Sequence, residues 1–221
     1  PYDMSRPVAP DALSGLGAAV GAPVRFGGTV APERVATIRD IAWRSWQIEA
    51  VTEAAHLESV NLMRFGRAGV AANPDGISVW GPGIEEGVAA GQITRESMLP
   101  GGAGYRVMID RYTPMLAATP AYVWLITQGG GRAAQLAAGR DWLRVNLAAT
   151  AAGLSVQPLS QALQEFPEVA GPYAEMHAAL APGGGPYGGA GTTVQMLARL
   201  GYAPPVPPTP RWPVDTRIRA V

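Results

Sequence analysis

Residues 121–152 read AYVWLITQGGGRAAQLAAGRDWLRVNLAATAA, and this stretch decides the fold. Residues 121–127 are almost all apolar and β-favouring, which predicts a strand buried on both faces. The glycines at 129–131 end that strand. Residues 132–152 are rich in Ala and Leu and contain no proline, which predicts a helix that Gly153 stops. One face of this helix is small enough to allow close approach of another backbone or a planar ligand; it consists of Ala137, Ala138, Ala148, Ala149 and Ala152.

Upstream of this stretch, the pattern predicts helices around one edge strand. A short helix over residues 12–20 is closed by Gly21. Residues 23–30 alternate weakly among glycines, which favours an edge strand. A long helix begins at Pro32, since proline suits the first helical position, and a second helical stretch covers residues 57–65.

Downstream, the sequence predicts one more helix, one more strand and an extended tail. The helix covers residues 167–181 and is offset by a Gly-Pro pair inside it. A glycine-rich loop follows at 182–191, and residues 193–200 alternate as a strand does. Residues 203–213 are dense in proline, which predicts extended, polyproline-like chain.

The middle of the chain, residues 66–104, has a different character. Strong turn signals interrupt it, so only short helices over residues 84–90 and 94–98 are expected. We interpret this segment as a lid-like insertion in a single domain of residues 1–221, with residues 203–221 as its tail. The turn signals are the sequences NPDG at 73–76, GPG at 81–83 and PGG at 100–102.

Composition excludes several classes of function. Of the 221 residues, 48% are apolar, so the chain is expected to fold. The formal charge is +0, from 17 basic and 17 acidic residues, which argues against nucleic acid or an anionic membrane as main partner. All basic residues are Arg, so catalytic Lys chemistry is excluded. The absence of Cys excludes disulfides, thiolate nucleophiles and Cys-ligated metal.

The sequence leaves the compartment open. No apolar run approaches the roughly 20 residues that a membrane-spanning helix needs. The chain opens at Pro1 rather than Met, which predicts that it is processed, trimmed or part of something longer. The lack of Cys suits an oxidising space without establishing one.

Two features of the long helix could bind an anion, and each also has a simpler interpretation. A strand, three glycines and a helix can bind an anion at the helix N-terminus, but no phosphate-loop motif is present, and a simple reversal of direction is favoured. Arg132, Arg140 and Arg144 share one helix face. They can form an anion-facing ridge, or they can serve as a solvated face and as partners of Asp141, which composition favours.

The remaining titratable residues offer little chemistry by themselves. His56 and His177 lack metal-ligand spacing, so no metal site is expected, and both are interpreted as surface or capping residues. Carboxylate pairs on exposed helices are usually solvated, so glycosidase-type chemistry has weak support. Those carboxylates are Glu49, Glu53, Glu58, Glu85 and Glu86.

Residues 153–165, GLSVQPLSQALQE, form the most specific segment. They place Pro, Ser and Gln in a turn after the Ala-rich helix. Backbone N–H and amide groups there can address a flat heteroaromatic ring, although a plain helix–helix connection is the alternative reading.

The order of these segments resembles the C-terminal half of nitroreductase-superfamily flavoproteins. It is most similar to the long, duplicated Acg-like members and to the group often exported by twin-arginine signals. The last three blocks carry the most specific part of the likeness. The matching blocks are residues 2–3, 6–8, 58–64, 74–77, 138–140, 144–147, 158–165, 193–202 and 210–213.

The resemblance implies an α+β fold with a mostly antiparallel sheet flanked by helices, FMN bound between two halves, and a dimer. It implies that a loop after the long helix lies along the flavin, held here by Pro158, Leu159, Ser160 and Gln161. It also implies that Arg211 in the tail grips the FMN phosphate, which suits the bidentate geometry of arginine. Thr209 stands where simpler relatives carry a second basic residue, so this grip is expected to be weaker.

Three functions remain open at this point. The first is an FMN-dependent oxidoreductase that moves hydride from a donor such as NAD(P)H to nitroaromatic, quinone or related acceptors. The second is a flavin-sequestering protein with little turnover. The third is a half-domain that completes a flavin site with a missing N-terminal half or a second chain. Resemblance to exported relatives indicates the periplasm, with the cytoplasm as alternative.

Overall fold

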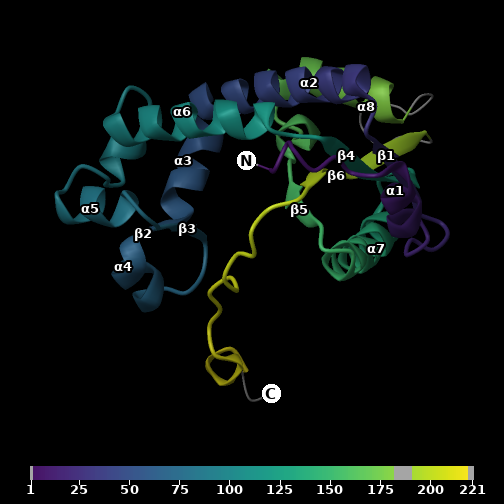
Figure 1. The fold of residues 1–221 in the computed structure, drawn as a ribbon. Helices are drawn as coiled ribbons and strands as arrows, with labels where there is room; N and C mark the ends of the chain where they lie inside the picture. The colour runs from purple at the N-terminus through teal and green to yellow at the C-terminus, as the bar shows by residue number, and fades with distance from the viewer. Residues whose placement is uncertain (1, 182–190, 219–221) are drawn as a thin grey trace. The chain divides into compact units, whose positions relative to one another are not determined.

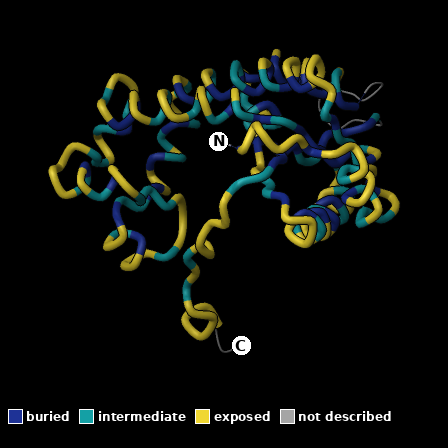
Figure 2. Tube along the Cα trace, viewed as in Figure 1, coloured by how far each residue is buried: buried dark blue, intermediate teal, exposed yellow. Residues whose placement is uncertain are grey.

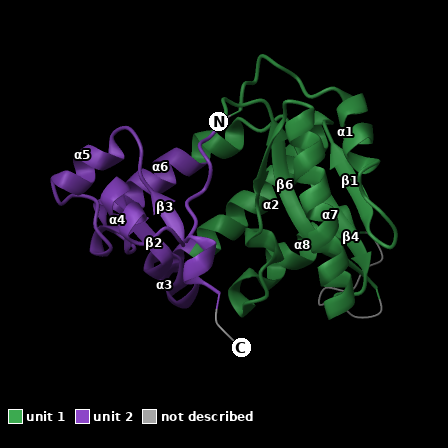
Figure 3. Ribbon diagram, turned by 90° about the horizontal axis from the view of Figure 1, so that it is seen from below, with its two compact units in different colours: residues 1–49, 113–205 green, residues 50–112, 206–221 purple. Residues whose placement is uncertain are grey.

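The computed structural model describes residues 2–181 and 191–218. The backbone packs into two compact units, which Figure 3 colours separately. The first consists of Pro1–Glu49 and Thr113–Pro205, and the second of Ala50–Tyr112 and Val206–Val221. The predicted glycine-rich loop lies outside the described residues except for Gly191.

A four-stranded sheet forms the centre of the first unit. Its order is β1 (Arg25–Thr29), β4 (Ala121–Gln128), β6 (Thr192–Gly201) and β5 (Ser155–Pro158), and every neighbouring pair is antiparallel. The first seven residues of β4 are buried, as a strand covered on both faces must be (Figure 2). The mostly antiparallel sheet, the buried strand and the edge position of β1 are confirmed.

Helices cover both faces of this sheet (Figure 1). On one face α7 packs its Val145 against Leu125 of β4 and Val24, because a 3.6-residue period gathers its apolar residues on one side. Helices α2 and α8 lie on the opposite face. The helices that flank the sheet are α1 (Pro10–Gly17), α2 (Pro32–Val51), α7 (Arg132–Ala151) and α8 (Ala170–Leu180), with 3-10 turns η2 (Gln161–Leu163) and η3 (Pro167–Val169).

The helices that the sequence predicts are present, with shifted ends. The first stops at Gly17 instead of Val20, because the amides of Ala19 and Val20 donate to the carbonyls three residues earlier, of Leu16 and Gly17, which tightens the chain into a turn. Helix α7 ends as predicted, and Gly153 adopts a φ of 69° there, which glycine reaches without strain. The helix after Pro167 begins as a 3-10 turn and continues as α8.

The second unit is mostly helical. The predicted helix over residues 57–65 is wrong at its end, since Met63–Phe65 forms strand β2 and pairs in parallel with β3 (Ile77–Val79). That partner is distant in sequence, so local periodicity did not reveal it. Residues 66–104, predicted to be a lid-like insertion, lie within this unit, and the fold does not test the lid role. The other elements are α3 (Glu53–Leu62), α4 (Gly66–Ala72), α5 (Ile84–Ala89), η1 (Glu96–Met98), α6 (Ala103–Ala117), whose last turns belong to the first unit, and η4 (Val214–Thr216).

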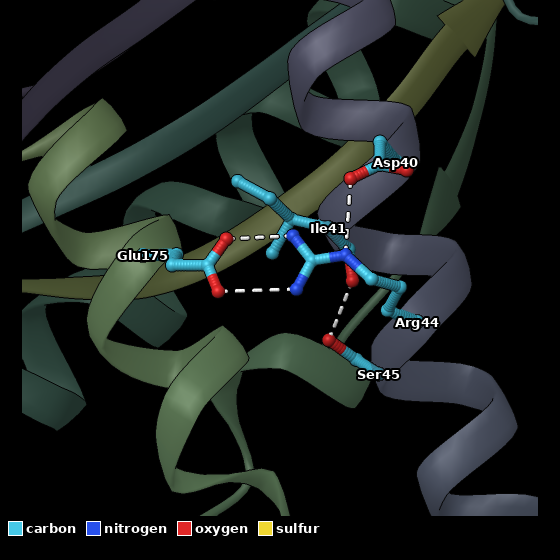
Figure 4. Close-up of polar contacts among 5 residues, drawn as sticks. All are labelled: Asp40, Ile41, Arg44, Ser45 and Glu175. Carbon is cyan, nitrogen blue, oxygen red and sulfur yellow. Dashed lines mark hydrogen bonds and ion pairs between the residues drawn. The ribbon is translucent and has the colours of Figure 1, made fainter.

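An ion pair joins α2 to α8 at the edge of the first unit (Figure 4). The Arg44 guanidinium donates to both carboxylate oxygens of Glu175, at 3.0 and 2.6 Å, and to Asp40 one turn earlier. The Arg44 hydrogen bonds lower the pKa of the Glu175 carboxyl. Both side chains are about half exposed, so the pair contributes modestly to stability.

Both histidines, interpreted as surface or capping residues, are buried, so the surface alternative is wrong. His56 is 4% exposed and its Nε2 donates to Met98 O at 2.7 Å. His177 is 2% exposed, stacks on Tyr173 with ring centroids 4.1 Å apart, and donates from Nδ1 to Tyr173 O. Because His177 follows Tyr173 by one helical turn, it shares the inward face of α8.

We expect acid to destabilise the fold through His177. Burial lowers the pKa of this imidazole from its ordinary value. The unfolded chain therefore binds the proton more readily, and the free energy of unfolding falls as pH drops below about 6.5 toward the folded-state pKa. His177→Phe keeps a ring on Tyr173 and removes the titration. The melting temperature of the variant, followed from pH 8 to pH 5, should fall less than that of the wild type, and equal slopes would contradict this origin.

Candidate functional site

The predicted flavin-contacting loop, residues 158–161, continues from the edge strand β5. Pro158 ends the strand opposite Ala198, where a missing N–H is tolerated at a sheet edge. Leu159 turns into the core, is 1% exposed, and donates its amide to Leu197 O at 2.9 Å. Ser160 is exposed and Gln161, half-buried, begins η2. Leu159 therefore anchors the loop through its buried side chain, whereas Pro158 and Ser160 are exposed and Gln161 is half-buried, and their contact with a flavin stays a prediction.

Arg199 of β6 holds the strand that carries this loop. Its side chain is 1% exposed, among the most buried in the first unit. One terminal nitrogen, Nη1, donates to the Gln157 side-chain oxygen, next to Pro158. The Nε donates to Thr119 Oγ1 at 2.7 Å, and Nη2 donates to the carbonyls of Met115 and Ala118. A buried guanidinium is tolerated only where its donors are satisfied, so this network fixes the position of β5.

Tyr2 closes the same cluster from the N-terminal segment. Its ring centroid lies 4.7 Å from the Arg199 Cζ, and its hydroxyl donates to Arg199 O at 3.1 Å. The ring also covers Gly201, where a Cβ atom would come within 2.5 Å of Tyr2 Cγ. Burial raises the pKa of the Tyr2 hydroxyl to about 12, so it stays protonated and can donate.

Sequence reasoning missed this anchor. The alternation of residues 193–200 predicts only a strand, with Arg199 on the side that also carries Gln195 and Leu197. Because Gln195 shares that side, the local pattern gives no signal that Arg199 is buried and multiply hydrogen-bonded.

The second predicted group, Thr209 and Arg211, lies on the tail in the second unit. Both residues are exposed, and Arg211 Nη1 donates to Pro210 O at 2.9 Å. The adjacent Trp212 fixes the tail by donating from Nε1 to Asp75 Oδ2 at 2.8 Å. Arg64 pairs with the other oxygen of Asp75 at 2.9 Å.

The Asp75 carboxylate is therefore the point to which the tail is attached. The hydrogen bond from Trp212 and then the contact with Arg64 lower its pKa. Arg217 adds a cation–π contact, with its Cζ 4.2 Å from the Trp212 ring centroid. The two predicted groups thus lie in different units, each ordered locally, and their convergence on one flavin stays a prediction.

Two arginines of α7 are partners of Asp141, the alternative that composition favours over an anion-binding ridge. Arg144 Nη1 lies 2.7 Å from Asp141 Oδ1, and Arg140 Nε lies 3.8 Å from the same atom. Asp141 is buried and also accepts from the Gly21 amide at 3.1 Å. The glycines before α7 form a bend, and the Gly129 amide donates to Gly191 O at 2.7 Å, which continues the pairing of β4 with β6.

Within residues 2–181 and 191–218, no group of three or more His, Asp or Glu side chains is arranged to hold a metal ion. In the same part of the chain, no helix has the length and apolar character needed to cross a bilayer.

Comparison with protein-family models and with curated proteins finds no match. Among solved structures, the chain is similar to the FMN and NADPH-dependent nitroreductase NfnB from Sphigopyxis sp. strain HMH, with 16% identity and a TM-score of 0.56 over 100% of this chain and 92% of that one. It is also similar to an FMN-bound nitroreductase from Desulfitobacterium hafniense, with 14% identity and a TM-score of 0.51 over 100% and 90%. The chain therefore has the nitroreductase-like fold, as its sequence predicts.

We expect Arg199 to be essential to the stability of the first unit. Arg199→Met leaves the Gln157, Thr119 and carbonyl oxygens without their donor, which should lower the free energy of unfolding by about 3–5 kcal/mol. Arg140→Met, on an exposed helix face, is the matched control and should cost at most about 0.5 kcal/mol. Urea unfolding followed by tryptophan fluorescence measures both, and equal losses for the two variants would refute the anchoring role.

Proposed function

We propose that this protein is an FMN-dependent oxidoreductase that transfers hydride from NAD(P)H to nitroaromatic, quinone or related acceptors. The observation that carries the proposal is the nitroreductase-like fold over the whole chain, shared with structures whose names include FMN. NfnB is also named as NADPH-dependent, which supports a nicotinamide donor. Each of these structures is under 25% identical to this chain, so cofactor and donor are inferred from the fold and the donor groups together.

The residues available for FMN suit its chemistry. The polar rim of an isoalloxazine ring takes hydrogen bonds from hydroxyl, amide and backbone groups, which Ser160 and Gln161 carry. The phosphate is a dianion, for which the exposed Arg211 is an apt partner. Neither requirement involves Lys or Cys, which the sequence lacks, or a metal, for which the sequence offers no ligand spacing.

Bound FMN would supply the hydride chemistry itself, so the protein needs only to bind and orient it. The Leu159 anchor and the Arg199–Gln157 hydrogen bond hold the loop in one conformation before a ligand arrives. Such preorganisation limits the entropy lost on binding. In the tail, Trp212 and Asp75 restrict the backbone next to Arg211 in the same way.

The likeness to duplicated, exported relatives leads us to include a second half in the proposal. That half, on a longer precursor or on a separate chain, would complete the flavin site, and the protein would work in the periplasm. Thr209 supports the need for it, because a single arginine in the tail holds a phosphate less firmly than two basic residues do.

The decisive experiment combines spectroscopy with turnover. Purified protein is mixed with FMN, freed of unbound flavin, and examined for the flavin absorbance band before and after anaerobic addition of NADH or NADPH. Bleaching that menadione or a nitroaromatic compound reverses is the expected result. A band that neither nucleotide bleaches would replace the proposal by flavin sequestration. Protein that stays colourless until a second half is added would assign the half-domain role.

We expect Arg211 to contribute to FMN binding only through its contact with the phosphate. Arg211→Ala is expected to weaken FMN binding by about 10- to 100-fold, the effect of one lost charge-assisted contact, and to leave riboflavin binding unchanged. Arg106→Ala, exposed on α6, is the control and should change neither. Fluorescence titration with both flavins measures the difference, and an equal loss for riboflavin would exclude a phosphate role.

Thr209→Arg provides the opposite change. If Thr209 stands in place of a second basic residue, the variant should bind FMN more tightly by several-fold, again without effect on riboflavin. Unchanged FMN affinity in Thr209→Arg would indicate that the tail does not contact the phosphate.

A separate prediction concerns the contact of the loop at residues 158–161 with the isoalloxazine ring. The Ser160→Pro, Gln161→Ala double variant removes one backbone donor and one amide, and should weaken FMN and riboflavin equally, by about tenfold or more. Gln135→Ala, exposed on α7, is the control. Equal flavin affinity in the double variant and the wild type would remove the loop from the site.

A further inference from the structure

The second unit contains a groove that none of the predicted flavin-contacting residues lines. It has a volume of about 610 Å³ and lies between α5, the loop that follows it and one face of α6. Sites for small molecules commonly have volumes of about 300–1,000 Å³. All of the lining belongs to residues 83–111, so the groove is complete within one unit.

Much of the groove wall is apolar. Ile84 of α5 is 7% exposed, Ile93 of the loop is half-buried, and Val107 of α6 is 41% exposed. Ala103 precedes Val107 by about one helical turn, so α6 presents both side chains on one face. A ligand whose apolar part covers Val107 would remove this side chain from water, which favours binding.

Close contacts fix the shape of the groove. The amides of Gln92 and Ile93 both donate to the Gly87 carbonyl, at 2.8 and 3.0 Å, which folds the loop back onto α5. Gly87 also leaves room for Ile93, since a Cβ atom there would lie 2.8 Å from Ile93 Cδ1. At the start of α6, a Cβ atom on Gly104 would lie 2.7 Å from the Met98 sulfur. The groove is therefore formed before a ligand arrives, which limits the entropy lost on binding.

Two oppositely charged side chains line the same groove. Glu86 belongs to α5, and Arg111 belongs to α6, about one turn after Val107. Both are exposed, and among residues 2–181 and 191–218 neither side chain has a hydrogen-bond or ion-pair partner. The neighbouring Glu85, by contrast, already accepts from the Arg67 amide. The charges of Glu86 and Arg111 are therefore available to a ligand.

These two charges define the class of ligand. A phosphate or a fatty acid would be attracted by Arg111 but repelled by Glu86, and a simple amine would meet the reverse. A zwitterion satisfies both, because its carboxylate matches the planar guanidinium and its ammonium group can donate to a carboxylate. The apolar wall in turn requires an apolar body. Apolar amino acids and short apolar peptides with free ends share this chemistry.

We propose that the groove between α5 and α6 binds a small zwitterion with an apolar body, of the kind that an apolar amino acid or dipeptide provides. Arg111 binds its carboxylate and Glu86 binds its ammonium group. Ile84, Ile93 and Val107 contact its apolar part. The inference rests on the second unit alone and is independent of flavin binding.

Ligands altered at one end test the two charges. L-leucine and leucyl-leucine are titrated into the isotope-labelled full chain, and NMR should show shifts of the Gly87, Ala90 and Gly104 amides. N-acetylleucine lacks the ammonium group and leucinamide lacks the carboxylate, so each should bind more weakly than L-leucine by about fivefold or more. The tighter ligand of the first two distinguishes a free amino acid from a peptide as the source of the zwitterion.

Variants of the full chain assign each charge to one end of the ligand. Arg111→Gln should weaken L-leucine binding and abolish the discrimination against leucinamide, whereas Glu86→Gln should abolish the discrimination against N-acetylleucine. The matched controls are Arg106→Gln on α6 and Glu58→Gln on α3, which alter exposed residues outside the groove and should change neither. Because all four side chains are exposed, circular dichroism should show unchanged folding.

Three results would overturn the proposal. The first is that neither zwitterion shifts these amides, or that L-leucine, N-acetylleucine and leucinamide bind equally well. The second is displacement of the zwitterion by FMN, which would assign the groove to the flavin site. The third is a dimer in sedimentation that Val107→Ser dissociates and that L-leucine does not affect, which would assign the groove to an interface with a second copy.

Discussion

The first unit depends on the buried guanidinium of Arg199. Its donors reach a neighbouring strand through Gln157 and the chain before β4 through Thr119, and Tyr2 covers it from the N-terminal segment. Segments far apart in sequence are therefore held by one side chain that cannot be left partly unsatisfied. Such a network permits one arrangement of the sheet edge, which is what a loop needs if it is to present Ser160 and Gln161 reproducibly.

The same physical rule orders the tail in the second unit. A proline-dense segment forms no helix or strand of its own, so its position must come from side-chain contacts. Asp75 provides them by accepting from Trp212 and Arg64 at the same time. The carboxylate is exposed and not buried like Arg199, so the tail is held less firmly than β5, and Arg211 beside it keeps the freedom to reach a ligand.

Helix α7 leads from the central sheet into the segment that carries the predicted flavin loop. Its inner face is covered by the sheet, which keeps the following segment and β5 in place, and its outer face is left apolar and basic. The burial of Asp141 explains why that outer face is positive although the whole chain is neutral.

Local sequence determined the elements whose signals are local. The apolar run 121–127 and the Ala-rich stretch after it predicted β4 and α7, and Gly153 marked the end of the helix, because strand and helix periodicity and glycine backbone freedom act over a few residues. Sequence order also predicted the nitroreductase-like fold and the mostly antiparallel sheet. Only the tertiary structure placed His177 in the core, turned Met63–Phe65 into a strand and buried Leu159 and Arg199. In each of these cases a distant segment supplies the partner or the cover, and local periodicity carries no information about it.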